Sequence, residues 1–283
     1  MKKIIVIGSS NIDMVVRTSH LPAPGETILG GEFFMNQGGK GANQAVAVKR
    51  LGGNLIFVAK LGNDILGQQS VDYFKKEGID TKYITLDENS ASGANMLLNE
   101  QDVDKVVEEM CEGDILLMQL EIPIQTVEYA ARRAFEKGVK VVLNPAPARS
   151  LPKELLRYLF MITPNRIEAE MLTGIKIVND ADAERVAKEI SVMGVQNIIV
   201  TLGSKGCLVR EGDTSYCVDA FKVEPVDTTA AGDTFNGALC VGLAEGMNLR
   251  QAAVMASKAS SVAVTRMGAQ SSIPHRKELD LNE

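Results

Sequence analysis

The sequence predicts an α/β protein with a doubly wound, mainly parallel sheet, helices on both faces and a small β lid. Short apolar runs alternate with helical segments along the chain, and polar or glycine-rich turns follow several of the runs. The 283 residues contain no repeat, low-complexity segment or linker, and this length suits one large domain. We therefore expect a single domain over residues 1–283, with ligands at the carboxyl ends of the strands.

The first half of the chain contains one segment that departs from regular α/β elements. Residues 20–36 alternate turn signals with short β-like pieces, and residues 81–93 behave similarly. Together they are expected to form a small antiparallel lid, with segments at about 14–36 and 81–96. The regular elements expected here are strands at 4–7 and 55–59, a helix at 42–51, and a helix that follows Asp64 and ends near Gly78.

The second half is more regular, with strands and helices in close alternation. Two long helices are expected to close the chain. The expected strands are 115–119, 139–143, 159–163 and 197–201, with a hairpin of 206–210 and 214–218; the expected helices are 124–137, a short one from about 166, 182–193, 232–245 and 248–265.

Composition excludes several classes of protein. The 30 Lys and Arg residues against 36 Asp and Glu give a net charge of −6, which argues against a nucleic-acid partner. No stretch approaches the ~18 consecutive apolar residues of a membrane helix. The four cysteines are scattered without a C-x-x-C pair, as expected of a reduced, cytoplasmic protein. With only His20 and His275 present, a His-rich zinc site is excluded, and we expect both to be surface residues.

The strongest candidate site lies between Asp227 and Ala238. Four small residues at 229–232 precede Asp233, and an amphipathic helix follows. Without bulky side chains, the N–H groups of residues 231–233 can converge on an anion at the positive end of the helix dipole. A carboxylate placed there could accept a proton from a hydroxyl that attacks a phosphoryl group. Asp233 could instead only cap the helix, but the run of small residues favours a site.

Two segments in the first half could bind a polyhydroxyl ligand. Residues 36–43 contain three glycines, which let the backbone approach a ligand, and Lys40 and Asn43 offer donors suited to sugar hydroxyls. The spacing is not that of a Walker A loop, and a plain turn with a helix start remains open. Asn11 and Asp13 follow the first strand, and an Asp can accept two hydrogen bonds from a vicinal diol; a turn-forming pair is the alternative.

Two further motifs could serve a nucleotide and its metal. Asn165 and Glu168 share a face of a helix start, so their oxygens could hold magnesium directly or through water. Asn165 could instead be an N-cap to which Glu168 reaches back. Residues 201–206 form a strand followed by a glycine-rich turn, which could accommodate a nucleotide or be an ordinary hairpin.

In combination, Gly38–Asn43, Asn165-x-x-Glu168 and Asp227–Asp233 resemble the ribokinase-like carbohydrate kinase family. The similarity covers nearly the whole chain in order, and the stretches 39–47, 119–121, 143–148 and 263–270 resemble the bacterial ribokinases of that family. The resemblance implies a ribokinase-like fold and an ATP-dependent enzyme that phosphorylates the primary 5-hydroxyl of D-ribose, giving ribose 5-phosphate and ADP. A related sugar or nucleoside kinase, acting on deoxyribose, fructose or adenosine, is the alternative.

The resemblance also implies roles for the matching positions. Asp233 would be the general base, and Ala231, Gly232 and Asp233 would form an anion hole. The pentose would be held by Asn11, Asp13, Gly39, Lys40, Asn43, Glu121 and Asp233. ATP would be bound by Asn165, Thr201, Leu202, Gly203, Ser204, Lys205, Gly206, Gly232 and Ser257. Magnesium would be organised by Asn165 and Glu168, and an activating potassium ion by Asp227, Thr229, Ala263, Arg266, Gly268 and Ser272, mostly through backbone oxygens.

One departure from the family pattern concerns the lid. The family has two further strands, about 19 residues by ordinary strand lengths, where Gly93 here runs directly into Ala94. Either the chain lacks these strands or this sequence omits a mobile segment, and the clean break inside a flap favours omission. The lid in the given sequence is incomplete between Gly93 and Ala94. The resemblance implies a homodimer through the lid, and if the loss is real, both this dimer and lid closure over the sugar would be compromised.

Two other function classes fit less well. A nicotinamide dehydrogenase would share the sheet, but residues 8–11 lack its glycine fingerprint. A non-catalytic sugar-binding module would not need the intact Asp233 and the small residues before it.

Overall fold

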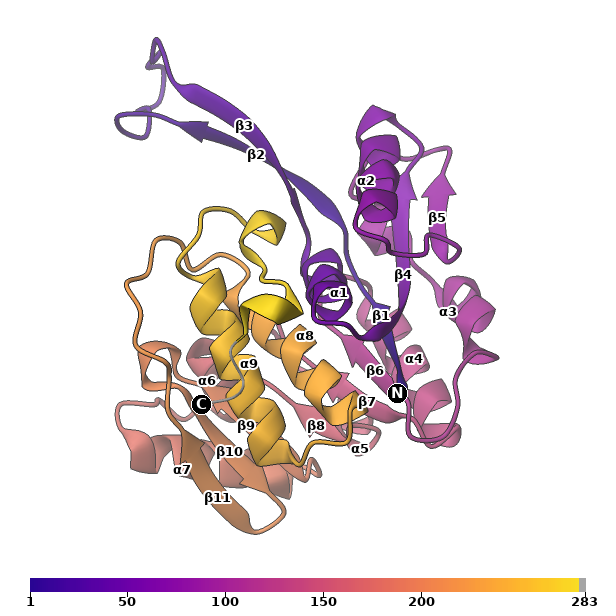
Figure 1. Cartoon of the computed structure of the whole chain (residues 1–283), viewed down its shortest axis with the longest axis vertical. Coiled ribbons are helices and arrows are strands. Elements are labelled where there is room, and N and C mark those ends of the chain that lie inside the picture. The colour runs from indigo at the N-terminus through magenta and orange to yellow at the C-terminus, as the bar shows by residue number, and fades with distance from the viewer. Residues whose placement is uncertain (280–283) are drawn as a thin grey trace.

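A nine-stranded sheet forms the centre of the molecule in the computed structural model, which describes residues 1–279 (Figure 1). Its strand order is β11-β10-β9-β8-β7-β6-β1-β4-β5, and all neighbours are parallel except β10, which is antiparallel to β9 and β11. The strands are β1 (Lys3–Ile7), β4 (Asn54–Gly62), β5 (Ile84–Asp87), β6 (Ile115–Met118), β7 (Lys140–Leu143), β8 (Met161–Ile162), β9 (Asn197–Thr201), β10 (Cys207–Glu211) and β11 (Thr214–Val218).

Helices cover both faces of this sheet, as the sequence predicts. One hydrophobic core lies under α1, α2, α8 and α9, and a second lies under α3 to α7. Strand β1 contributes alternately to the two cores, Ile4 and Val6 to one and Ile5 and Ile7 to the other. The helices are α1 (Lys40–Arg50), α2 (Ile65–Lys76), α3 (Glu100–Val107), α4 (Ile124–Glu136), α5 (Lys153–Arg157), α6 (Arg166–Thr173), α7 (Asp180–Val192), α8 (Ala231–Ala244) and α9 (Leu249–Ala263), with 3-10 turns η1 (Ala94–Leu97), η2 (Gly203–Lys205), η3 (Gln270–Ser272) and η4 (Arg276–Glu278).

A two-stranded antiparallel ribbon of β2 (Asn11–Arg17) and β3 (Glu32–Gly38) projects from the body of the molecule (Figure 1). Its register pairs Asp13 with Asn36 and Met14 with Met35. Because side chains alternate along a strand, Asp13 and Asn36 share the face that lines a cavity. The opposite face carries exposed apolar side chains at Met14, Val16, Phe33 and Met35.

The second predicted lid segment does not join this ribbon. Within residues 81–96, β5 pairs in parallel with β4 at the edge of the main sheet. The reason is its apolar alternation, since Ile84 and Leu86 pack against the core under α1 and α2. The helix α3 was not expected from the sequence, and the strand predicted at 159–163 is reduced to Met161–Ile162.

The chain between β5 and α3 is short and fixed on both sides. Ser92 donates to the Asp64 carboxylate through its backbone N–H at 2.8 Å and its hydroxyl at 2.5 Å. Gly93, with φ +89°, then turns the chain into η1, and the Asn95 side chain accepts the N–H of Ser10 at 2.9 Å.

Within residues 1–279, no helix has the length and apolar character needed to span a bilayer.

Candidate active site

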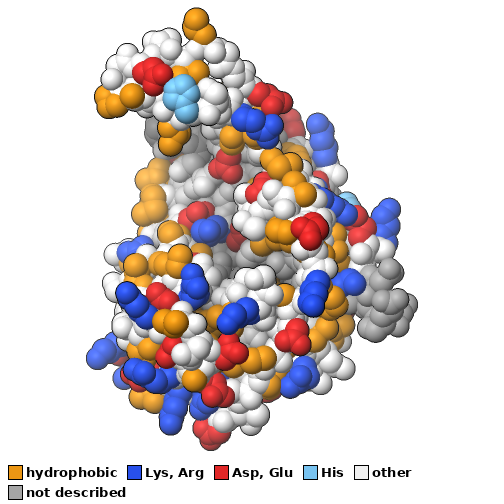
Figure 2. Space-filling model, turned by 90° about the vertical axis from the view of Figure 1, so that its left-hand side faces the viewer, with side chains coloured by type: hydrophobic (Ala, Val, Ile, Leu, Met, Phe, Trp, Pro, Cys, Tyr) orange, Lys and Arg blue, Asp and Glu red, His pale blue; other side chains and the backbone are white. Residues whose placement is uncertain are grey.

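The candidate site lies where the order of the sheet changes direction, between β1 and β6. Loops leaving the carboxyl ends of adjacent strands diverge at such a point and leave room for a ligand. The loop after β1 supplies Ser9, β2 begins at Asn11, and the loop after β6 supplies Glu121. Helices α1 and α8 begin beside these loops, so the predicted positions from the two ends of the chain meet here. Figure 2 shows a hollow between the projecting ribbon and the body of the molecule.

Asp233 occupies the first turn of α8 and is only 6% exposed. Its Oδ2 accepts a hydrogen bond from Asn43 Nδ2 at 2.8 Å, and its Oδ1 accepts one from Gln44 Nε2 at 3.0 Å. Burial raises the pKa of the Asp233 carboxyl, while the positive charge of Lys40 and these two donors act to lower it. The result is a buried carboxyl with a strengthened affinity for a proton, held by residues of α1.

The backbone before Asp233 adopts a turn that small residues permit. Ala230 has φ +59° and is the one non-glycine residue among 1–279 in the left-handed region. The N–H of Thr234 bonds back to the Ala230 carbonyl at 2.8 Å. The N–H groups of Gly232 and Asp233 donate to no acceptor among the described residues. Two unpaired donors therefore sit at the positive end of the α8 dipole, beside the Asp233 carboxylate, as an anion site requires.

Glycines 39 and 41 bring the start of α1 against the turn after β1. A Cβ at Gly39 would lie 2.7 Å from the Asn11 nitrogen, and one at Gly41 would lie 2.5 Å from backbone atoms of Gly8 and Ser9. The Glu121 carboxylate joins both segments, because its Oε2 accepts from Ser9 Oγ at 2.5 Å and from the Lys40 N–H at 3.0 Å. The predicted sugar-binding residues of this segment are therefore in one place.

Asn11 and Asp13 lie on the adjoining part of the ribbon. Asn11 Oδ1 accepts a hydrogen bond from Asn95 Nδ2 at 2.6 Å. Asn95, in the η1 turn that follows β5, therefore holds the Asn11 side chain in place. The Asp13 carboxylate lies against Gly38, where an added Cβ would be 2.4 Å from Oδ2. Partial burial, and then the negative charge of Glu121, raise the pKa of Asp13. Asn43 Oδ1 is buried without a partner among the described residues.

A cavity of about 440 Å³ lies on the other side of the α8 N-terminus. It brings together most of the positions predicted for the nucleotide with those of the anion site. Asn165, Leu202 and Lys205 do not line it. Asn165 caps α6, Leu202 packs against the core under α3 to α7, and Lys205 lies 3.5 Å from Asp180. The predicted residues that line it are Thr201, Gly203, Ser204, Gly206, Ala231, Gly232 and Ser257.

Asn165 and Glu168 form a reciprocal cap at the start of α6. Asn165 Oδ1 accepts the Glu168 N–H at 2.9 Å, and Glu168 Oε2 accepts the Asn165 N–H at 2.8 Å. Glu168 is buried, and its charge interacts with those of Lys40 and Asp233. Burial raises the pKa of Glu168, the Asn165 N–H and the charge of Lys40 lower it, and the charge of Asp233 raises it.

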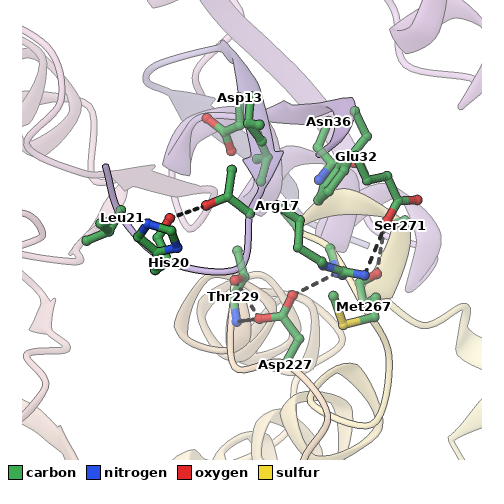
Figure 3. Close-up of a pocket in the computed structure, with 16 residues that line it drawn as sticks. Asp13, Arg17, His20, Leu21, Glu32, Asn36, Asp227, Thr229, Met267 and Ser271 are labelled. Carbon is green, nitrogen blue, oxygen red and sulfur yellow. Dashed lines mark hydrogen bonds and ion pairs between the residues drawn. The ribbon is translucent and has the colours of Figure 1, made fainter. Parts of the chain in front are cut away.

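Two of the positions predicted for a monovalent cation, Thr229 and Gly268, hydrogen-bond to a third, Asp227. Its Oδ1 accepts from the Thr229 N–H at 2.9 Å and hydroxyl at 2.6 Å, and its Oδ2 accepts from the Gly268 N–H at 2.9 Å. These three residues line a cavity of about 870 Å³ below the ribbon (Figure 3). Arg266 directs its side chain elsewhere, to Glu278, and the Ser272 hydroxyl donates to the Ala269 carbonyl at 2.8 Å.

Figure 3 shows Asp13 and Asn36 on one side of this cavity, and Asp227 and Thr229 on the other. Among residues 1–279, no three His, Cys, Asp or Glu side chains are placed to share a metal ion. A cation held by this chain would therefore also need backbone, water or substrate oxygens, which are ligands that potassium and magnesium accept.

Several residues of the site were not assigned a role from the sequence. The buried side chains of Gln44, Gln119 and Asn144 form a hydrogen-bonded group behind Asp233. Asn95 supports Asn11 from the opposite side. Polar residues within otherwise apolar elements could have indicated a buried polar group, but the sequence does not show which of these side chains contact one another.

The comparison with protein families identifies the chain. A model described as pfkB family carbohydrate kinase matches residues 1–114 and 91–276. A ribokinase from Haemophilus influenzae is 42% identical over 296 aligned positions, covering 98% of this chain and 97% of that protein. A deoxyribokinase from Salmonella typhimurium is 33% identical over 304 positions and 99% of each chain. Both alignments exceed the 283 residues of this chain, so these relatives contain residues that it lacks.

The fold agrees with this family. A structure of Arabidopsis thaliana ribokinase complexed with ribose and ATP superposes with a TM-score of 0.90 at 28% identity, covering 98% of this chain and 97% of that one. The ribokinase-like α/β fold predicted from the motifs is confirmed. The chain belongs to the pfkB family of carbohydrate kinases and is a ribokinase-like sugar kinase.

Proposed function

We propose that the enzyme transfers the γ-phosphoryl group of ATP to the 5-hydroxyl of D-ribose, with Asp233 as the general base. The observation that carries this proposal is the position of the Asp233 carboxylate. It bonds to Asn43 on the ribbon side and stands beside the unpaired N–H groups at the start of α8, next to the cavity of about 440 Å³. A sugar hydroxyl on one side and a terminal phosphate on the other would meet at this carboxylate.

The chain supplies the groups that such a transfer needs. Asp233 accepts the proton of the attacking hydroxyl, and the raised pKa of this buried carboxyl favours that step. The N–H groups of Gly232 and Asp233 stabilise the charge on the transferring phosphoryl group. Lys40 adds a positive charge, which acts on Asp233 and on Glu168 alike.

The preference for ribose rests on the polar groups of the ribbon side. The Asp13 carboxylate lines the cavity below the ribbon and can accept two hydroxyls of a vicinal diol. The relative with 42% identity is a ribokinase, whereas the deoxyribokinase is 33% identical. The structure with a TM-score of 0.90 is described with ribose and ATP bound, which agrees with this assignment.

We assign the cofactors to the remaining predicted positions. The adenine nucleotide takes the cavity lined by Thr201, Gly203 and Ser257. Asn165 and Glu168 hold the magnesium ion of MgATP through water, because their oxygens already accept hydrogen bonds from each other's N–H groups. An activating potassium ion binds beside the anion site at the positions around Asp227, mostly through backbone oxygens. Magnesium neutralises phosphate charge when it is bound.

The assembly and location follow from other parts of the surface. We propose a homodimer through the lid, because the outer face of the β2–β3 ribbon exposes Met14, Val16, Phe33 and Met35 together. We also propose a cytoplasmic enzyme, since its four cysteines are all free thiols.

ADP release from MgATP tests the function. We expect turnover with ribose that exceeds turnover with deoxyribose, fructose or adenosine and that rises with potassium chloride. Asp233→Asn should stay folded and lose about 10²-fold or more in kcat. Asn197→Leu, which changes an amide at the far end of β9 that bonds only to the Phe160 carbonyl, is the control for folding. Turnover by Asp233→Asn near the wild-type rate would refute the role of Asp233, and a preference for another substrate would refute the ribose assignment.

A further inference from the structure

Behind Asp233 lies a group of buried amide side chains that no step of the proposed reaction uses. Gln44 and Gln119 are fully buried, and Asn144 is nearly so. Gln44 lies at the centre, because its amide contacts Asp233, Gln119 and Asn144 at once. These residues come from α1, the end of β6 and the end of β7, so the group joins three elements beneath the base.

Both polar atoms of the Gln44 amide have hydrogen-bond partners. Nε2 donates to Asp233 Oδ1 at 3.0 Å and to Asn144 Oδ1 at 3.1 Å, which uses both of its hydrogens. Oε1 accepts from Gln119 Nε2 at 2.5 Å. A rotation of this amide by half a turn would place its oxygen against two acceptor oxygens. Such a buried arrangement is costly, so the amide has one allowed orientation.

The orientation of Asn144 is fixed in the same sense, whereas the Gln119 amide is set only by its donation to Gln44, because Gln119 Oε1 is buried without a partner among residues 1–279. Asn144 Nδ2 donates to the Thr163 carbonyl at 3.3 Å, which turns Asn144 Oδ1 toward Gln44. Gln119 lies against Gly8, where an added Cβ would be 2.1 Å from Gln119 Oε1. Only a glycine at position 8 therefore leaves room for Gln119 to reach Gln44.

A second arm of this polar group reaches the anion site. The Thr163 hydroxyl donates to Asn236 Oδ1 at 2.6 Å, and Asn236 Nδ2 donates to the Gly232 carbonyl at 2.8 Å. The carboxylate of Asp233 and the peptide group of Gly232 are thus supported from one buried network. Two side-chain amides of α1 therefore donate to the Asp233 carboxylate: that of Gln44, which belongs to the buried network, and that of Asn43.

We propose that Gln44 is a positioning residue: its amide fixes the Asp233 carboxylate in one orientation and stabilises its ionised form by a charge-assisted hydrogen bond. Only the kinetic consequence of this proposal depends on the function proposed above; the position and ionisation of the Asp233 carboxyl do not. Gln44 contacts no substrate, because it is fully buried beneath Asp233. Its effect on the reaction is exerted through Asp233 alone.

The direct test is the titration of the Asp233 carboxyl itself. ¹³C NMR of aspartate-labelled, ligand-free enzyme, with the signal assigned from Asp233→Asn, is compared in the wild type and in Gln44→Met. Methionine keeps the length of the side chain and removes its donors. We expect the midpoint to rise by about one pH unit, the effect of losing one hydrogen bond to a charged group. An unchanged midpoint would overturn the proposal.

A second variant guards against a failure of Gln44→Met to fold. Gln119→Met leaves the Gln44 amide in place and removes only the donor to its oxygen, so we expect a smaller rise in the same direction. Asn197→Leu removes a side-chain amide at the opposite end of the sheet and should leave the titration unchanged. Unchanged titrations in both glutamine variants, or an equal rise in the control, would contradict the proposal.

Kinetics separate this inference from the proposed function. If Asp233 is the base, the acid limb of kcat/KM in Gln44→Met should move by the same amount as the NMR midpoint. The KM values for ribose and MgATP should stay within about twofold, since no binding contact is lost. A shifted NMR midpoint with an unmoved acid limb would support the positioning role and refute Asp233 as the base. An unshifted midpoint would refute the positioning role whatever the activity.

Discussion

Replacement of Asn95 by alanine tests how the sugar side of the site is supported. Asn95 is 7% exposed and makes two hydrogen bonds, accepting from the Ser10 N–H at 2.9 Å and donating to Asn11 Oδ1 at 2.6 Å. The substitution leaves the N–H of Ser10, a fully buried residue, without its partner, and it releases Asn11. Asp233 and its amide donors are not touched.

The magnitude follows from these two bonds. A buried group left unpaired costs about 1–3 kcal/mol, and each 1.4 kcal/mol corresponds to about a factor of ten in binding. We therefore expect KM for ribose to rise by about tenfold or more. The value of kcat should stay within about threefold, because the groups that act on the phosphoryl group are unchanged. The free energy of unfolding should fall by about 1–3 kcal/mol.

The assay is initial-rate kinetics with ribose varied at saturating MgATP, and then with MgATP varied. Asn89→Ala is the matched control, since Asn89 is an exposed amide on the same connection between β5 and η1. A lowered kcat at an unchanged KM for ribose would refute the reasoning, because it would place the action of Asn95 on the phosphoryl-transfer side. A raised KM for MgATP alone would refute it as well.

Three further predictions concern the scaffold. Gly41→Ala should lower the free energy of unfolding by about 1–3 kcal/mol in urea titrations, because its Cβ would lie 2.5 Å from the Gly8 carbonyl carbon; a wild-type midpoint would contradict this. Ala230→Val should destabilise by about 1–2 kcal/mol while Ala230→Gly stays near neutral, since φ is +59° there; equal stabilities would show that the turn is unstrained. Hydrogen bonds from Ser92 hold the pKa of Asp64 at about 2, below its ordinary 3.8, so the stabilisation is present at neutral pH and is lost as pH falls through this range. The difference in thermal midpoint between wild type and Asp64→Asn should therefore narrow on acidification, and a constant difference would exclude this linkage.

Most of the main sheet could be predicted because its strands are short apolar runs between turn signals. The segment at 81–93 shows the limit of that reasoning. Its alternation of apolar residues fits a lid strand and a sheet-edge strand equally, and only contacts between Ile84, Leu86 and the core decide. Helix α3 carries a capping box of Asn99 and Asp102, a visible signal, but its eight residues are too few for a clear period.

The site was predictable where a local motif carries the chemistry and not where distant residues meet. Asp233 and the small residues before it stand together in the sequence, so this candidate anion site could be proposed from the sequence alone. Gln119 lies 75 positions from Gln44, and Asn144 lies 100 positions from it. No spacing rule connects such residues, because the strand order that brings them together is itself a product of folding.

A ribbon of only two strands beside the candidate site has a consequence for ATP consumption. Water is a hydroxyl nucleophile too, and the two amides that donate to the Asp233 carboxylate, those of Asn43 and Gln44, belong to the chain itself. Discrimination between the sugar and water would therefore depend on the exclusion of solvent from the hollow between the β2–β3 ribbon and the body of the molecule. The rate of ATP hydrolysis without sugar measures directly how much ATP the enzyme consumes without forming a sugar phosphate.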